Sequence, residues 1–500
     1  MNGLMIQGTA SDVGKSLICT ALCTILHQRG YKVTPFKSQN MSNNSYVTKD
    51  GKEIGRAQGI QAEAANIEAS VEMNPILLKP QSDEKAEIVL LGKRYQSLGG
   101  REYRDTFYEK GLEVIQSSLA KLSEQFEAVV IEGAGSPVEI NLNDRELVNM
   151  KVAEIADVPV ILVADIDRGG VFASIIGTLT LLSETERKRV KGIIINKFRG
   201  DQSLFESGRK WLEEKTGIPV LGVIPYVDHA ISGEDSLSIS ARFQSQEVSE
   251  IDIAVMKLPY ISNYTDAEPF LFEEGVSVRM VSTLSEFGNP DAVIIPGTKS
   301  TISDLHSLRA SGLEQRIKTF VQSGGTIVGI CGGYQMLSKQ LIDEYGTDTG
   351  ISGYNTAGFN LIPAVTTFSQ WKKTIQTEGT THPLSGFSSL PVRGYEIHLG
   401  QTMFQGPHTP LLMVENEAEG VSIEDGCILG TYVHNLFHND LFRTAWLNKL
   451  RGRKGLPEQK MVSMEKEKMN QYENLAAHVE KHLDVQKLLE IMTAWREQHG

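Results

Sequence analysis

The sequence is poor in cysteine and carries fewer basic than acidic residues. Only four cysteines occur among 500 residues, too few and too scattered for a disulfide framework. Lys and Arg number 49 against 62 Asp and Glu. The resulting net charge of −13 argues against binding to the phosphate backbone of nucleic acids. These shortages exclude a disulfide scaffold and disfavour a nucleic-acid-binding protein.

Long apolar runs are also missing. The apolar runs, such as Val158 to Ala164, have the length of a strand and are far shorter than a membrane-spanning helix. The N-terminus lacks the basic start and long apolar stretch of a signal peptide. We therefore expect a cytoplasmic protein without membrane contact. Cys19 and Cys23, four residues apart on a predicted helix, are interpreted as small core residues, since no second cysteine pair follows.

Short apolar runs alternate with helical patterns in the first half of the chain. Residues Lys15–Gln28 have apolar side chains at helical spacing. The apolar runs show no polar alternation, as expected for parallel strands that are covered on both faces. They are Leu4–Gln7, Tyr31–Phe36, Ala128–Ile131, Val158–Ala164 and Gly192–Ile195. The pattern predicts an α/β fold with a doubly wound parallel sheet.

Changes in composition divide the chain into four parts. We predict a first α/β domain over residues 1–235 and a polar linker, rich in Ser, Glu and Gln, over 236–250. A second α/β domain is expected over 251–450, with strands at Ile253–Leu258, Ala292–Ile295 and Thr326–Ile330. Residues 451–500 form a charged helical extension. Its apolar residues lie on one helical face and predict a closing helix; they include Leu475, Ala476, Val479, Leu483 and Leu488.

A glycine-bounded loop joins the first predicted strand to the first predicted helix. Small residues let backbone N–H groups close around phosphate oxygens, and the N-terminus of the helix favours negative charge. Lys15 is expected at the β- and γ-phosphates of ATP, and Ser16 at Mg²⁺. Five residues, rather than four, separate the two glycines. The loop residues assigned to the nucleotide are Gly8, Thr9, Asp12, Gly14, Lys15 and Ser16.

Polar residues at the ends of other strands support a nucleotide site. Ligands of doubly wound sheets bind at the carboxyl ends of the strands. Glu132 ends a predicted strand and is a candidate second ligand of Mg²⁺, which prefers oxygen donors. Lys37 follows the second strand, and Asn196 ends another strand where its amide is expected at adenine. Asp165 and Asp167 also lie at a strand end and are weaker candidates for metal or substrate.

The most informative segment of the second half surrounds Cys331. A predicted strand runs into this cysteine, two glycines follow, and then a helical pattern begins. Such a sharp turn exposes a nucleophile, and the start of a helix favours the thiolate. The backbone N–H of Gly332 is a candidate donor to an oxyanion, and Gly297, at the end of another strand, is a candidate second donor.

A cysteine nucleophile needs a base, and His434 is the favoured one. It ends the segment Gly430–His434 in the same predicted domain as Cys331. His438, about one helical turn later, is the main rival. His398 belongs to another polar cluster that is expected to line the site.

The second half resembles the class I glutamine amidotransferase family, in its cobyric and cobyrinic acid branch. The resemblance implies that Cys331 is the nucleophile, that His434 is the base and that glutamine is hydrolysed through a thioester to release ammonia. Members typically carry a Glu two residues after the histidine, where this sequence has Leu436. The sequence does not show what replaces that carboxylate. The long phosphate loop and the segment Glu132–Gly135 resemble dethiobiotin synthetase and its relatives.

Nearly the whole chain resembles the cobyric acid synthase family. The segment 39–42, Gln-Asn-Met-Ser, favours this branch over cobyrinic acid a,c-diamide synthase. The segments that carry the resemblance are Pro35–Ser42, Gly55–Gln58, Asn74–Pro80, Ala164–Phe172, Ile194–Asp201 and Gly394–His398.

The resemblance implies a ligase that uses ATP, Mg²⁺ and L-glutamine. Its implied corrinoid substrate is adenosylcobyrinic acid a,c-diamide, amidated on four carboxylates through acyl phosphates to give adenosylcobyric acid. The first domain would be the ATP-dependent amidoligase and the second the glutamine amidotransferase. Cobyrinic acid a,c-diamide synthase, or another glutamine-dependent amidoligase, is the closer alternative. A MinD/ParA-like ATPase switch is the alternative of a different class. The oligomeric state, the order of amidation, the residues that contact the corrin and the route of ammonia stay open.

Overall fold

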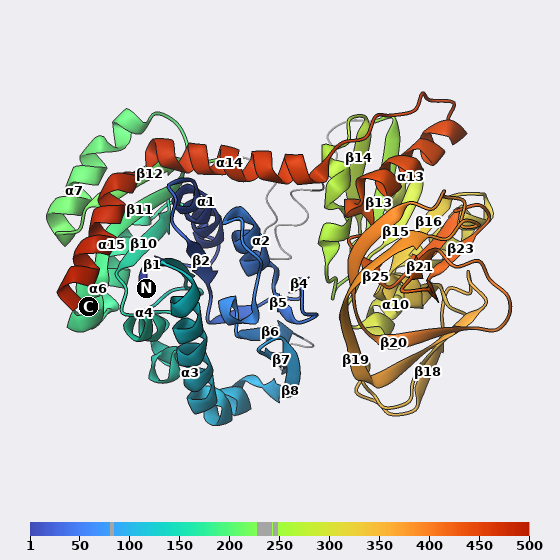
Figure 1. The fold of residues 1–500 in the computed structure, drawn as a ribbon, viewed down its shortest axis with the longest axis horizontal. Helices are drawn as coiled ribbons and strands as arrows, with labels where there is room; N and C mark the ends of the chain where they lie inside the picture. The colour runs from blue at the N-terminus through green and yellow to red at the C-terminus, as the bar shows by residue number, and fades with distance from the viewer. Residues whose placement is uncertain (81–84, 228–242, 244–248, 500) are drawn as a thin grey trace. The chain divides into compact units, whose positions relative to one another are not determined.

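The computed structural model describes residues 1–80, 85–227, 243 and 249–499. They divide into two compact units (Figure 1). The first unit contains Met1–Ser42, Glu53–Glu234 and Lys468–Gly500, and the second contains Asn43–Lys52 and Asp235–Glu467. Most of the linker predicted over 236–250 lies outside the described residues. In the part of the chain that is described, no helix is both long and apolar enough to cross a membrane.

A six-stranded parallel sheet forms the centre of the first unit, in the order β12-β11-β10-β1-β9-β2. The all-parallel sheet confirms the prediction from the apolar runs. Its strands are β1 (Asn2–Gly8), β2 (Val33–Phe36), β9 (Ala128–Glu132), β10 (Val160–Asp165), β11 (Val190–Phe198) and β12 (Val220–Pro225).

Helices cover both faces of this sheet, as a doubly wound fold requires. Leu4 and Ile6 of β1 point into one hydrophobic core, and Met5 between them points into the other. The first core includes α1 (Lys15–Gln28), α2 (Arg56–Ala64), α14 (Met464–His482) and α15 (Val485–His499). The second includes α3 (Gly100–Gln125), α4 (Met150–Ala156), α5 (Val171–Leu181) and α7 (Glu206–Thr216). Cys19 and Cys23 are buried in the first of these cores, which confirms their structural interpretation.

A smaller mixed sheet follows the second strand of the first unit. Its order is β3-β6-β7-β8. The strands are β3 (Gln39–Met41), β6 (Ile76–Pro80), β7 (Lys85–Leu90) and β8 (Lys93–Gly99). Between β3 and β6 the chain forms β4 (Ser45–Val47) and β5 (Glu53–Gly55), and helix α6 (Glu184–Arg189) precedes β11. The residues around β4 belong to the second unit, although their neighbours in sequence belong to the first.

The closing segment consists of two helices where the sequence predicted one. Helix α14 ends before Leu483, which forms an antiparallel bridge with Gly222 at the end of the parallel sheet. Asp484 donates its backbone N–H to the Leu221 carbonyl, and its carboxylate accepts the N–H of Lys487 in the first turn of α15. These bonds to the sheet edge replace helical bonds and break the helix, although the apolar face continues across the break.

The second unit also contains a central sheet, in the order β14-β13-β15-β16-β24-β23. The pairs from β14 to β24 are parallel, and β23 is antiparallel. The strands are β13 (Ile251–Met256), β14 (Val276–Val281), β15 (Ala292–Ile295), β16 (Thr326–Ile330), β23 (Val421–Ile423) and β24 (Ile428–Thr431). The helices among the described residues of this unit include α9 (Leu284–Phe287), α10 (Thr301–Ala310), α11 (Leu313–Gln322), α12 (Gly332–Leu337) and α13 (Asp440–Arg453).

A second, mixed sheet stands beside the central one in this unit (Figure 1). Its long hairpin pairs β19 (Ala364–Thr381) with β20 (Pro391–Phe404). The other strands are β17 (Gln340–Asp343), β18 (Tyr354–Ala357), β21 (Leu412–Val414), β22 (Glu417–Glu419) and β25 (Val433–His434). The α/β class predicted for both halves is confirmed.

Candidate functional site

The glycine-bounded loop lies between β1 and α1, as the sequence predicts. Lys15 is buried, and its Nζ donates to the carbonyls of Ala10 and Gly135, each at 3.1 Å. Gly14 has φ +98°, which favours glycine because it has no Cβ. The Thr9 N–H donates to Val163 of β10 at 2.9 Å, and Asp12 has φ 59°. The loop therefore curls over the N-terminus of α1, where backbone N–H groups favour an anion.

Asn196, expected at adenine, supports the phosphate loop in this structure. Its Nδ2 donates to the Val13 carbonyl at 2.8 Å. A Cβ on Gly14 would overlap the same Nδ2, so the amide fills the space that this glycine leaves. The next residue, Lys197, donates to the Asp12 carbonyl and, at 2.9 Å, to Asp165 Oδ2. Two strand ends thus hold the phosphate loop in place.

Glu132, at the end of β9, is buried among three donors. Ser16 Oγ donates to its Oε1 at 2.7 Å, Lys37 Nζ to Oε1 at 2.9 Å and Gln61 Nε2 to Oε2 at 2.6 Å. Burial alone would raise the pKa of Glu132. The charge of Lys37 and the hydrogen bonds from Ser16, Lys37 and Gln61 outweigh burial and lower that pKa. The carboxylate is thus held ionised beside the phosphate loop.

The residues around Ser16 fit a magnesium ion that also binds phosphate. Ser16 Oγ and Glu132 Oε1 are neighbouring oxygen donors of the kind that Mg²⁺ prefers. Among the described residues, no group of three or more His, Cys, Asp or Glu side chains is arranged to hold a metal ion. In proteins, Mg²⁺ is usually held by one or two protein oxygens together with phosphate and water.

Cys331 lies at the turn between β16 and α12. Its backbone has φ 52° and ψ −109°, a region that costs free energy for a residue with a side chain. A Cβ on Gly333 would overlap the Ile295 carbonyl oxygen of β15, so the turn packs too tightly for any other residue there. The thiol is buried, and its Sγ lies 3.6 Å from the Ile397 carbonyl of β20. This is the geometry of a nucleophile elbow.

His434, at the end of β25, interacts with Cys331 and with a carboxylate. Its Nδ1 lies 2.7 Å from Asp266 Oδ2, and Asp266 Oδ1 accepts the backbone N–H of Asn435 at 2.6 Å. Burial would lower the pKa of His434. The charge and hydrogen bond of Asp266, together with Cys331, raise it instead to about 10. The structure therefore brings Cys331, His434 and Asp266 together in the order of a catalytic triad.

The two candidate oxyanion donors also lie beside this triad. Gly332 directly follows Cys331 and begins α12. A Cβ on Gly297 would stand 3.0 Å from His434 Cε1, and one on Gly332 would stand 3.1 Å from the Thr298 backbone N. The segments after β15 and β16 thus approach each other closely at the thiol.

The two other candidate histidines have different surroundings. His398 stacks on Tyr432 with ring centroids 3.8 Å apart, and its Nε2 lies 3.0 Å from Glu396 Oε2. His438 lies in the 3₁₀ turn η6 (Leu436–His438), one turn after His434. The imidazole that interacts with the Cys331 thiol in this structure belongs to His434.

Comparison with known proteins covers the whole chain. Residues 4–237 match the CobQ/CobB/MinD/ParA nucleotide binding domain, and residues 252–442 match the CobB/CobQ-like glutamine amidotransferase domain. A cobyric acid synthase of Geobacillus thermodenitrificans is 49% identical over 99% of this chain and 99% of its own length. A cobyric acid synthase of Synechocystis is 46% identical over 98% of each chain. The chain belongs to the cobyric acid synthase family.

Membership of the cobyric acid synthase family makes the chain an enzyme, a glutamine-dependent ligase that forms amides. The family belongs to cobalamin biosynthesis, and its nucleotide-binding and amidotransferase domains correspond to the two α/β patterns in the sequence. The resemblance stated from the sequence motifs is confirmed. The ATPase switch is set aside as an alternative, because the relatives match both halves of the chain.

Asp266 is the site residue that sequence reasoning missed. It stands 168 positions before His434, on the 3₁₀ segment η5 (Tyr264–Phe272), whereas class I enzymes typically carry the carboxylate two positions after the histidine. No motif marks it. The sequence indicated only that a carboxylate was missing, because Leu436 stands where other members carry the Glu that pairs with the histidine.

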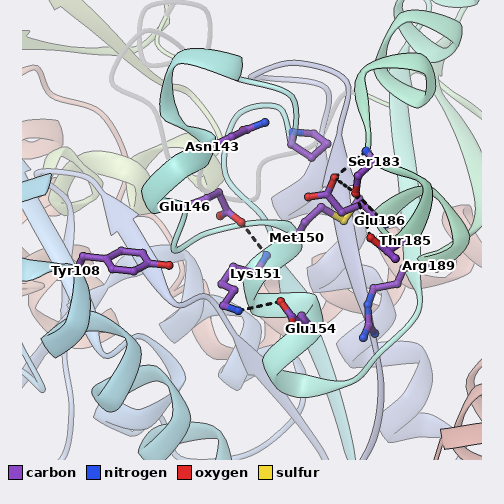
Figure 2. Close-up of a pocket in the computed structure, with 11 residues that line it drawn as sticks. Tyr108, Asn143, Glu146, Met150, Lys151, Glu154, Ser183, Thr185, Glu186 and Arg189 are labelled. Carbon is purple, nitrogen blue, oxygen red and sulfur yellow. Dashed lines mark hydrogen bonds and ion pairs between the residues drawn. The ribbon is translucent and has the colours of Figure 1, made fainter.

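Two pockets differ in their relation to these residues. One pocket, of about 490 Å³, lies in the first unit. Its lining residues include Tyr108, Glu146, Lys151, Ser183 and Arg189 (Figure 2). It contains none of the predicted site residues.

The other pocket, of about 460 Å³, lies in the second unit. Its lining includes Tyr334, Lys373, Glu396, His398, Glu419 and Tyr432. His398 is the neighbour in sequence of Ile397, whose carbonyl faces the Cys331 thiol. This pocket therefore adjoins the triad.

Proposed function

We propose that this chain transfers the amide nitrogen of glutamine to four carboxylates of adenosylcobyrinic acid a,c-diamide, using ATP, to give adenosylcobyric acid. The observation that carries the proposal is the Cys331 elbow with His434 and Asp266, in a chain whose other unit presents a phosphate loop. The relatives named cobyric acid synthase support the choice of corrinoid substrate over that of a cobyrinic acid a,c-diamide synthase.

The glutaminase reaction begins with the Cys331 thiol. His434 holds the proton given up by the thiol, and the resulting thiolate attacks the carboxamide carbon of glutamine. Backbone N–H groups at Gly332 and Gly297 hold the oxyanion. His434 returns the proton to the leaving ammonia, and water then cleaves the thioester to glutamate. Asp266 orients the imidazole through Nδ1 and stabilises its charged form.

The pocket beside the triad suits the two charges of an amino acid. Lys373 and His398 line it and would donate to a carboxylate, and Glu396 and Glu419 line it and would accept from an ammonium group. Glu396 is already bonded to Lys373 Nζ at 2.8 Å and to His398, and these partners lower its pKa against the effect of burial. Burial raises the pKa of Glu419 to about 7. We assign the glutamine backbone to this pocket.

The amidation half uses the residues around the phosphate loop. Lys15 and Lys37 neutralise charge as the γ-phosphoryl group moves to a substrate carboxylate, and the loop N–H groups hold the phosphates. Ser16 and Glu132 would hold Mg²⁺, which supplies further charge neutralisation when bound. The resulting acyl phosphate loses phosphate when ammonia attacks its carbonyl carbon.

Replacement of Cys331 by Ala tests this assignment. We expect glutamine-dependent amidation to fall by roughly 10³-fold or more, because the nucleophile is lost, whereas amidation with added ammonium salt persists. Cys427→Ala is the matched control, since Cys427 is a partly exposed cysteine of the same unit. Mass spectrometry of the product from the corrinoid diamide should show four added amides. Equal loss with both nitrogen sources, or a product with two amides, would contradict the proposal.

A further inference from the structure

A short segment from the first half of the sequence packs against the glutaminase triad. Residues Asn43–Lys52 belong to the second unit, whereas Ser42 before them and Glu53 after them belong to the first. The segment contains β4 and is joined at both ends to the nucleotide-binding unit by the backbone. The matched glutamine amidotransferase domain covers residues 252–442 and does not include this segment.

The first contact of this segment reaches His434 through Asn263. The Ser45 N–H donates to Asn263 Oδ1 at 3.0 Å, and the Asn263 N–H donates to Asn44 Oδ1 at 3.1 Å. Asn263 Nδ2 lies 3.4 Å from His434 Nε2. The three hydrogen-bonded residues Asn44, Ser45 and Asn263 are all buried. Asn263 has φ 52°, in the left-handed region that costs free energy for a residue with a side chain. The hydrogen bonds to Asn44 and Ser45 help to hold its backbone there.

The donor from Ser45 decides which end of the Asn263 amide faces the histidine. Because Oδ1 is occupied by the Ser45 N–H, the amide presents Nδ2 to His434. An N–H donor there stabilises the neutral ring with its lone pair on Nε2, and it competes with the Cys331 thiol for that lone pair. Asp266 at Nδ1 favours the charged ring instead. The position of Asn263 therefore adjusts how readily His434 takes up and returns the proton.

Two further contacts of the same segment converge on the triad. The Tyr395 hydroxyl donates to the Ser45 carbonyl at 3.5 Å, and the Tyr395 ring stacks on His434 with centroids 5.1 Å apart. Val47 packs with Tyr395 and Ile397 in one buried cluster. The Ile397 carbonyl is the group that faces Cys331 Sγ. Each of these contacts leads from the segment to a catalytic side chain through one intermediate residue.

We propose that residues 43–52 are a coupling segment: through Asn44 and Ser45 they position Asn263 against His434, so that the nucleotide-binding unit controls glutamine hydrolysis. This inference rests on the proposed glutaminase function and adds a positioning role for Asn44, Ser45, Asn263 and Tyr395. A rearrangement of the first unit when ATP and corrinoid bind would pull on both ends of the segment. Ammonia release would then follow substrate binding, which avoids wasteful hydrolysis of glutamine.

Paired substitutions in the full-length enzyme test the coupling. Ser45→Pro removes the backbone donor to Asn263, whereas Ser45→Ala keeps it. Tyr395→Phe removes the hydroxyl bond to Ser45 and keeps the ring on His434. We expect Ser45→Pro to lower kcat for glutamate release about tenfold and Tyr395→Phe to lower it about threefold, with KM for glutamine nearly unchanged. The exposed Lys49→Ala should stay within twofold of the wild type.

Two further readouts separate coupling from a folding defect. Ammonia-dependent amidation by Ser45→Pro should remain within twofold of the wild type, because the first unit is intact. Addition of ATP, Mg²⁺ and the corrinoid diamide should accelerate glutamate release by the wild type, and this acceleration should be lost in Ser45→Pro.

The proposal is overturned if Ser45→Pro and Tyr395→Phe release glutamate at the wild-type rate, if Ser45→Pro loses ammonia-dependent amidation equally, or if ATP and the diamide leave the wild-type rate unchanged. Glutamate release that survives Cys331→Ala would instead refute the glutaminase assignment itself, so the two failures are distinguishable.

Discussion

The two candidate centres of this protein are built in different ways. The phosphate-binding centre uses residues at the ends of neighbouring parallel strands: Phe36 pairs with Ile131, so Lys37 and Glu132, one position later on each strand, meet at the sheet edge. The glutaminase centre gathers Cys331, His434 and Asp266 from three separate segments of the second unit. Strand order therefore predicts the first centre, whereas the second depends on loop packing that leaves no local pattern.

Both centres pair a buried carboxylate with a cation, but the carboxylate has opposite roles. Glu132 is held by Ser16, Lys37 and Gln61 and is kept ionised beside the phosphate loop. Asp266 instead serves its neighbour, because it orients and charges His434. A buried ion pair that loses one partner leaves an uncompensated charge, so each pair can be broken selectively.

Loss of Lys15 should have the largest effect. We expect Lys15→Ala to reduce amidation by roughly 10³-fold with either glutamine or ammonia, because the charge beside the phosphates is removed. Glutamate release without ATP should continue, since the glutaminase triad is untouched. Product formation and glutamate release, measured in parallel, check both statements. A variant that keeps ammonia-dependent amidation would show that the phosphate loop is not the amidation centre.

Replacement of Asp266 tests the glutaminase centre alone. Asp266→Asn should lower kcat for glutamate release about 10²-fold, because the amide no longer stabilises the charged imidazole. Ammonia-dependent amidation should be unchanged. The matched control is Asp304→Asn, a buried aspartate of the same unit whose pKa burial raises to about 7. Wild-type glutamate release by Asp266→Asn would show that His434 works without this carboxylate.

The smallest expected effect is on stability as a function of pH. The pKa of His434 is about 10 in the folded protein and about 6.5 when unfolded. Folding therefore favours the protonated ring, and this stabilisation is fully present below pH 6.5 and is lost as pH rises towards 10. We expect the second unit of the wild type to unfold at a higher urea concentration than that of Asp266→Asn. This difference in urea midpoint should be largest at pH 6 and should shrink by pH 10. A difference independent of pH would contradict this linkage.

The parts that the sequence predicted share a simple physical origin. Apolar runs such as Val158 to Ala164 are what a sheet covered on both faces requires, and glycines around Lys15 and Cys331 are what tight turns require. These constraints act within a few residues and leave a visible pattern. Helix α1 was predicted with the bounds that the structure shows.

The parts that escaped prediction depend on distant contacts. Asp266 and Asn263 look like ordinary polar residues until His434 packs against them. The break between α14 and α15 follows from a bridge between Leu483 and Gly222, which lie far apart in the sequence. The local sequence around Ser45 does not show that this segment belongs to the second unit. A short strand has the same sequence pattern whichever unit it packs in.

The path of the backbone determines which fragments of this protein would contain a whole unit. The chain enters the second unit at Asn43, leaves it after Lys52, and leaves it again within helix α14. A glutaminase fragment cut from residues 251–450 would lack the strand that holds Asn263, and a synthetase fragment would lack its covering helices. Genes for the separate halves should therefore join Asn43–Lys52 to the glutaminase piece and residues 468–499 to the other.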